Sequence, residues 1–337
     1  MKPLSGSRLA GAASVLAILT AMGAYGSSAS AATFATGDIF ASVNNGHVNH
    51  YDSAGAFIEQ LNTGQTGFTT GMAFDGAGDL LVTNFTVGNI TKFSNTGAIV
   101  PPNPLVSPGH APESIAFDTA GDFYVGRAAG GTVQKYTAAG ALIQTLGTGG
   151  SDWIDLATDQ KTLFYNDEGG VIRRFDTATD SALADFADNT LHGGTDSFAL
   201  RILANGDVLS AAGSQINQYN SAGAFIGSYD ITGVDNFFAL NLDPNGTSFW
   251  TGSFGNDTLY KFTIGAFGLD HATQTLVAST GGNLFGVAIA GEITAGGPPS
   301  PNGGIPEPAT WAMLVLGFGG LGAMLRRRRR AATLATA

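Results

Sequence analysis

The chain has 337 residues, of which 49 are glycine, none is cysteine and only 12% are charged. The 26 acidic residues outnumber the 15 basic ones, so the formal net charge is −11. This negative field disfavours nucleic acid and anionic lipid as partners and favours cations. Without cysteine, stability must come from a buried core, and the many glycines favour short strands joined by tight turns.

The first 31 residues have the pattern of a secretory signal peptide. Lys2 and Arg8 form a basic segment, residues 9–24 are apolar, and residues 29–31 (Ala-Ser-Ala) supply the small side chains of a cleavage site. We therefore expect a signal helix over residues 1–31, which signal peptidase removes when the chain is exported.

One unit recurs six times between residues 32 and 292. Each copy has an aromatic residue three positions after an aliphatic one, usually directly behind a basic or amide side chain. These aromatics, 39 to 44 residues apart, are Tyr51, Phe93, Tyr136, Phe175, Tyr219 and Phe262. Several copies also contain an Asp-x-x-Gly-Asp turn, as at residues 75–79 and 118–122. Four short apolar runs per unit, separated by such turns, predict an all-β, six-bladed propeller.

The two ends of the repeat region complement each other. The first unit, residues 34–61, has three apolar runs but lacks an inner strand, whereas residues 283–290 supply an inner strand without successors. Together they complete the sixth blade, which covers two strand edges that would otherwise invite aggregation. We therefore expect Ile39 and Val287 to share one sheet. A β-sandwich or a solenoid is the alternative architecture.

Residues 112–125 (PESIAFDTAGDFYV) resemble the repeat of NHL-type six-bladed propellers. Other units depart from that repeat: residues 159–162 lack the turn glycine, and Leu203 replaces the leading aspartate. The resemblance implies the architecture but no single activity, because NHL-type propellers include RNA binders, lyases, lactonase relatives and plain scaffolds.

The loops that enter the innermost strands contain acidic residues. Residues 32–305 hold 8 basic and 25 acidic residues, a net charge of −17. The loops in question contain Glu113, Asp152, Asp196 and Asp235, and in a propeller they gather at one mouth of the central channel. A hard cation with six to eight oxygen ligands, such as Ca²⁺, would relieve their mutual repulsion. The set loosely resembles that of metal-dependent lactonase propellers, which implies a hydrolase or lyase as the alternative function. The simpler interpretation is that each aspartate only stabilises its own turn.

Other side chains in these loops give weaker patterns. His110, His192 and His271 are expected on the same face, but their different offsets from the inner strands argue against a zinc site. Trp153 and Phe237 flank the acidic residues and are suited either to stacking on sugar rings or to packing between blades. Because no hydrolase or nucleotide-binding motif accompanies them, a binding protein is favoured over an enzyme.

The C-terminal region begins with a linker, residues 293–305, which is rich in glycine and proline and predicted to be extended. Residues 309–325 then carry no charge, and as a helix they would span about 26 Å, close to a bilayer core of about 30 Å. A transmembrane helix is therefore predicted, followed by a cytoplasmic stop of five arginines and a disordered tail over residues 331–337. The stop consists of Arg326, Arg327, Arg328, Arg329 and Arg330.

Residues 306–330 resemble the PEP-CTERM sorting signal that exosortases of Gram-negative bacteria recognise. The motif residues are Pro306, Glu307, Pro308, Trp311 and Ala312. The resemblance implies an exosortase partner, transient insertion in the inner membrane, and delivery to the cell surface or the extracellular space; a permanent anchor is the alternative. Because exosortase systems accompany exopolysaccharide production, it also implies a binding or structural protein of the extracellular matrix, with exopolysaccharide or another matrix component as partner.

Overall fold

The computed structural model of the chain describes residues 33–109, 111–278 and 284–297. These residues form strands and one short 3-10 helix, η1 (Asn189–His192). None of the helices in these ranges is long and apolar enough to cross a bilayer. The signal helix, the transmembrane helix, the sorting motif, the arginine stop and the tail that the sequence predicts lie outside the described residues.

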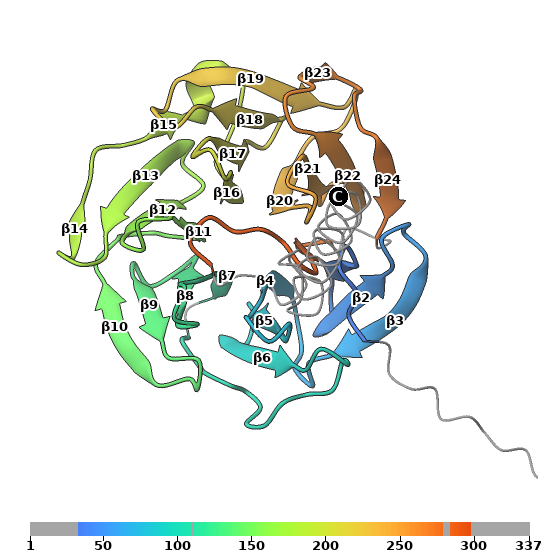
Figure 1. Ribbon diagram of the computed structural model, residues 1–337, viewed down its shortest axis with the longest axis vertical. Coiled ribbons are helices and arrows are strands. Elements are labelled where there is room, and N and C mark those ends of the chain that lie inside the picture. The colour runs from blue at the N-terminus through green and yellow to red at the C-terminus, as the bar shows by residue number, and fades with distance from the viewer. Residues whose placement is uncertain (1–32, 110, 279–283, 298–337) are drawn as a thin grey trace, which may run out of the picture. The chain divides into compact units, whose positions relative to one another are not determined.

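Six sheets stand around a central channel as the blades of a propeller (Figure 1). Blade 1 runs from the channel outward as β25 (Gly286–Ile289), β1 (Ile39–Ser42), β2 (His47–Tyr51) and β3 (Phe57–Asn62). Blade 2 contains β4 (Thr69–Phe74), β5 (Leu80–Asn84) and β6 (Asn89–Phe93). Blade 3 contains β7 (Pro112–Phe117), β8 (Phe123–Arg127), β9 (Val133–Tyr136) and β10 (Leu142–Leu146).

The other three blades complete the ring. Blade 4 contains β11 (Trp153–Leu156), β12 (Thr162–Asn166) and β13 (Val171–Asp176), with the short strands β14 (Ser181–Ala182) and β15 (Ala187–Asp188) both paired to β13. Blade 5 contains β16 (Leu200–Ile202), β17 (Val208–Ala211), β18 (Ile216–Tyr219), β19 (Phe225–Asp230) and β23 (Gly268–Leu269). Blade 6 contains β20 (Phe237–Leu242), β21 (Ser248–Ser253), β22 (Thr258–Thr263) and β24 (Gln274–Val277). The all-β, six-bladed prediction is confirmed.

Blade 1 is closed by the two ends of the propeller, as the sequence predicts. Strand β25 pairs antiparallel with β1, and Ile39 lies opposite Ile289 while Ala41 lies opposite Val287. These four side chains are all buried. The ring is therefore held by a ladder between segments almost 250 residues apart in the chain.

Blade 2 departs from the expected four strands, because the segment after β6 forms only isolated bridges. Val106 pairs with Ile90, and Ile99 pairs with Phe93. Pro101, Pro102 and Pro104 interrupt this segment. Since proline has no N–H to donate, it cannot continue a strand ladder.

The repeated residues have a common structural role. The column of aromatics is buried in the cores between blades, with Phe93, Tyr219 and Phe262 at most 1% exposed. The basic residue before the aromatic pairs with the turn aspartate, as in Lys92–Asp75 (Nζ to Oδ2, 2.7 Å). The Asp75 Oδ1 atom in turn accepts the backbone N–H groups of residues 77 and 79. The same lysine–aspartate pair recurs in blades 3 and 6, as Lys135–Asp118 and Lys261–Asp243, so in these three blades it fixes the first hairpin to the third strand.

The described chain ends by crossing the channel at the end opposite to where the innermost strands begin (Figure 1, orange-red). A buried ion network holds it there: Arg201 Nε donates to Glu292 Oε1 at 2.9 Å. Asp155, also buried, accepts the backbone N–H of residue 202 at 2.8 Å. Farther along, the Gln160 side chain donates to the carbonyl of Gly296 at 2.9 Å. The propeller thus retains contacts as far as residue 296, beyond the boundary expected at 292.

Candidate metal centre

Chain topology brings two kinds of loop to one end of the channel. The innermost strand of blade 4 begins at Trp153, which lies opposite Asn166 at the end of β12. The loop into β11 and the turn from β12 to β13 therefore lie at the same end. This end of the channel, where the innermost strands begin, is called the acidic mouth below.

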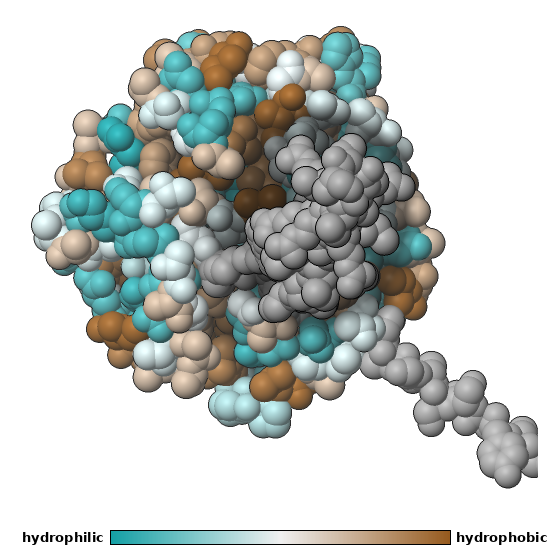
Figure 2. Space-filling model, viewed as in Figure 1, coloured by the Kyte–Doolittle hydropathy of each residue, from teal (hydrophilic) through white to brown (hydrophobic). Residues whose placement is uncertain are grey.

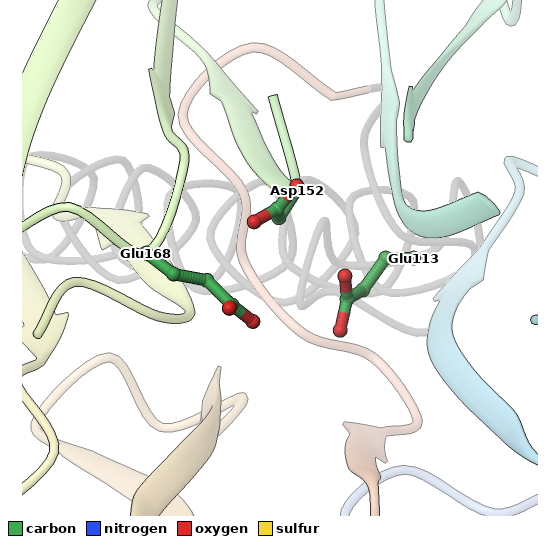
Figure 3. Close-up of side chains that lie close together, drawn as sticks. All are labelled: Glu113, Asp152 and Glu168. Atoms are coloured by element: carbon green, nitrogen blue, oxygen red, sulfur yellow. The ribbon is translucent and has the colours of Figure 1, made fainter. Parts of the chain in front are cut away.

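Three carboxylates meet at the acidic mouth, between blades 3 and 4. They belong to Glu113 in β7, Asp152 directly before β11, and Glu168 in the turn from β12 to β13. One oxygen of each lies within 4.8 Å of an oxygen of the other two, and the three side chains point into one opening (Figure 3). A cation that holds each oxygen at about 2.3–2.6 Å would fit between oxygens at this separation.

Close backbone packing places these groups. A Cβ atom at Gly71 would lie 2.1 Å from the carbonyl oxygen of Glu113, and one at Gly126 would lie 2.7 Å from that of Asp152. Only glycine lets the neighbouring strands come this near. The Ser114 hydroxyl also donates to the carbonyl of Asp152 at 2.6 Å. Blades 2, 3 and 4 are therefore locked together beside the cluster.

Burial makes the cluster electrostatically costly. Glu113 is 3% exposed and Asp152 5%, whereas Glu168 is exposed. The Oε2 atom of Glu113 is buried and has no hydrogen-bond partner among the described residues. A buried acceptor without a donor costs free energy, and a buried unpaired charge costs more. A cation would supply the missing partner for Glu113.

The pKa values reflect this environment. Burial, followed by the charges of Asp152 and Glu168, raises the pKa of Glu113 well above its usual value. Burial, with the neighbouring Glu168 and Asp167, raises the pKa of Asp152 to about 7. The pKa of Glu168, an exposed residue whose carboxyl is partly shielded from water by its neighbours, is raised by that partial desolvation and by the charges of Asp196 and Asp167. The three groups thus resist simultaneous ionisation unless a positive charge joins them.

Two of the four acidic residues singled out from the sequence, Glu113 and Asp152, lie in the cluster, and two do not. Asp196 lies near enough to raise the pKa of Glu168 but is not among the three ligand groups. Asp235 is exposed and acts on the pKa of Asp230 instead. Glu168 was not predicted, because it lies in the turn from β12 to β13 and not in a loop that enters an innermost strand. The sequence pattern that could have identified Glu168 is Asp-Glu-Gly-Gly at residues 167–170, which is typical of a turn. This turn joins β12 to β13 and therefore lies at the same mouth.

The weaker candidates are placed elsewhere. The described histidines contribute no ligand to the cluster, and the ring of His192 stacks on Phe225 with centroids 4.3 Å apart. His110 lies outside the described residues. Trp153 and Phe237 are buried and pack between blades 4, 5 and 6. Of the two roles expected for Trp153 and Phe237, stacking on sugar rings or packing between blades, the structure shows packing.

Comparison with known proteins identifies the tail and the fold. Residues 304–330 match the model of the PEP-CTERM protein-sorting motif. No curated protein matches the chain. Among solved structures, the chain is similar to the WD40 β-propeller domain of Doa1, with a TM-score of 0.56 and 14% sequence identity over 76% of this chain and 83% of that one.

At this identity the likeness shows the fold alone, and the NHL-type resemblance stays a prediction. The sorting motif indicates export and sorting to the cell surface or the extracellular space. The chain is thus an all-β, six-bladed propeller that carries a PEP-CTERM motif and is sorted by an exosortase.

Proposed function

We propose that the mature protein is a binding or structural component of the extracellular matrix and that its acidic mouth binds a divalent cation, Ca²⁺. One observation carries the cation proposal: the buried Glu113 carboxylate has an unpartnered oxygen and lies against two further carboxylates. Carboxylate oxygens are the ligands that Ca²⁺ prefers, and water or a bound molecule would complete its coordination. The sorting motif supports the extracellular role, and exopolysaccharide is the proposed matrix partner.

The cation proposal predicts how thermal stability depends on pH. The pKa of Asp152 is about 7 in the folded state and 3.8 ordinarily, so the folded state binds this proton more tightly. The stability gained from that proton is fully present below about pH 4 and is lost as the pH rises to about 7, at a cost on the order of 4 kcal/mol. In EDTA, the melting temperature is therefore expected to fall by several degrees between about pH 5 and pH 8.

Calcium is expected to reverse this fall at the higher pH, where its ligands are ionised, and to have little effect at the lower pH. In EDTA the Asp152→Asn variant should lose less melting temperature than the wild type between the two pH values, because Glu113 still titrates, and it should not respond to calcium. Asp235→Asn, which changes an exposed aspartate outside the cluster, is the matched control and should behave like the wild type. Equal calcium responses in wild type and Asp152→Asn would contradict the proposal.

A metal-dependent hydrolase or lyase is the second candidate function. The observation that favours it is the same carboxylate cluster, because a cation held there would polarise a substrate carbonyl or lower the pKa of a bound water. Turnover of a lactone panel by the wild type, lost in Asp152→Asn, would support this candidate over a binding protein.

We further propose the export route. Signal peptidase removes residues 1–31 in a Gram-negative host, the C-terminal segment inserts transiently in the inner membrane, and exosortase cleavage at the motif releases the propeller. The intact mass of the secreted protein is then expected to lack the arginines at 326–330. Secreted protein that retains this tail would contradict cleavage.

A further inference from the structure

A series of aromatic rings lies at the acidic mouth. It consists of Trp153, Phe238, Phe254, Phe285 and Phe68, in that spatial order, and is called the aromatic arc below. Successive ring centroids are 5.3, 6.3, 6.5 and 4.5 Å apart. Phe198 packs beside Phe238 at 4.9 Å.

The arc belongs to the mouth because its residues stand where innermost strands begin or where second strands end. Phe68 and Phe285 directly precede β4 and β25, and Phe254 directly follows β21. Phe238 sits at an irregularity in the pairing of β20. Phe68 and Phe254 are each 40% exposed, and Phe285 and Phe238 are half-buried. Rings from blades 1, 2 and 6 thus present partly open faces at one end of the channel.

The arc and the carboxylates together encircle the mouth. At one end, Trp153 directly follows Asp152 in the chain. At the other end, Phe68 opens into a groove lined by Phe85, Val87 and Ala111, and Ala111 is two residues before Glu113. Both ends of the arc therefore lie within two residues, along the chain, of a residue of the cluster or of the groove that leads to it.

We propose that the acidic mouth binds a polysaccharide, with apolar sugar faces on the partly exposed rings of the aromatic arc and sugar oxygens on the cation. This inference rests on the proposed cation site for its second contact. A sugar ring has the required mixture, since its C–H face packs on aromatic rings while its hydroxyl or carboxylate oxygens can coordinate Ca²⁺. A protein partner would instead be expected to need a broader apolar surface without charged groups at its centre. The negative charge of the mouth makes the cation the natural bridge to an acidic chain.

The test uses the secreted mature protein in native gels that contain Ca²⁺ and either hydroxyethyl cellulose, a neutral chain, or polygalacturonate, an acidic one. At least one polymer is expected to retard the wild type. Phe68→Ala and Phe254→Ala should each weaken that retardation roughly tenfold, the usual effect of losing one stacked ring. Retardation by the neutral polymer would identify hydroxyl ligands, and retardation by the acidic one alone would identify carboxylates.

Suitable controls lie on the rim, where apolar patches stand at β3, β10 and β19 (Figure 2). Phe57 in β3 and Leu142 in β10 are 58% and 55% exposed, and their alanine variants should bind like the wild type. Calorimetric titration with calcium alone separates the two proposals, because Phe68→Ala should keep its calcium binding. Arc-dependent retardation without calcium binding would refute the cation site and leave the sugar surface standing. No retardation by either polymer, or arc-dependent binding of unfolded casein instead, would overturn the inference.

Discussion

Replacing Arg201 with methionine is expected to lower the free energy of unfolding by about 3–5 kcal/mol, because it leaves two buried carboxyl groups without their cation. The Arg201 and Glu292 side chains are 6% and 8% exposed and joined at 2.9 Å. The charges of Glu292 and Asp155 raise the pKa of Arg201, and Arg201 in turn opposes the rise that burial causes in the pKa of Asp155. Chemical denaturation monitored by tryptophan fluorescence would measure the loss.

The loss should also depend on pH. Without Arg201, the two carboxyl groups can be kept neutral only by protons, so the variant should be more destabilised at neutral pH than in mild acid. Lys92→Met is the matched control: its ion pairs are more exposed, with the side chains of Lys92 and Asp75 each 16% exposed, and its loss is expected to cost about 1 kcal/mol or less. Equal stability of the two variants would mean that the network does not hold blades 4 and 5 to the C-terminal segment.

Ending the chain at residue 283 is expected to abolish folding, whereas ending it at residue 297 should preserve it. The shorter form loses β25 and exposes the edge of β1, which pairs with β25 over four residues. It also loses the buried side chains of Val287 and Ile289, each worth about 1.5–3 kcal/mol. Circular dichroism and gel filtration of the two forms would measure the difference.

The shorter form also lacks Glu292, so its unfolding alone would not show whether β25 or the ion pair is responsible. A second variant therefore tests the contribution of β25 separately. Ala288→Pro keeps Glu292 but disrupts a position that pairs with Phe40 in the closing ladder. It should unfold at a much lower temperature than the form ending at residue 297. A folded, monomeric chain ending at residue 283 would contradict closure as the source of stability.

Much of the fold could be predicted from the sequence, because the blades are built on one repeated pattern of short strands and turns. The aromatic column predicts the buried third strand, and the Asp-x-x-Gly-Asp turn predicts the first hairpin, whose Asp75 binds Lys92. The incomplete ends predict closure. The missing fourth strand of blade 2 was the exception, although the prolines at 101, 102 and 104 carried the signal.

The site was harder to predict because it is assembled between blades. Glu113 and Asp152 were found from the loops that enter innermost strands, whereas Glu168 lies in a turn one strand farther out. The arc was not predicted for a similar reason: its rings come from four blades, and contacts between blades such as Phe68–Phe285 join residues far apart in the sequence. Trp153 and Phe237 were candidates because acidic residues lie beside them in the sequence, but both are buried. The partly exposed rings are those of Phe68 and Phe254.

The cation site is the claim on which the proposed function depends, and anomalous diffraction from crystals grown with Mn²⁺ in place of Ca²⁺ tests it most directly. One strong anomalous peak is predicted between the carboxylates of Glu113, Asp152 and Glu168, at about 2.2–2.6 Å from an oxygen of each. The peak should vanish in crystals of the Glu113→Gln variant. Wild-type crystals with no peak at this position would contradict the account.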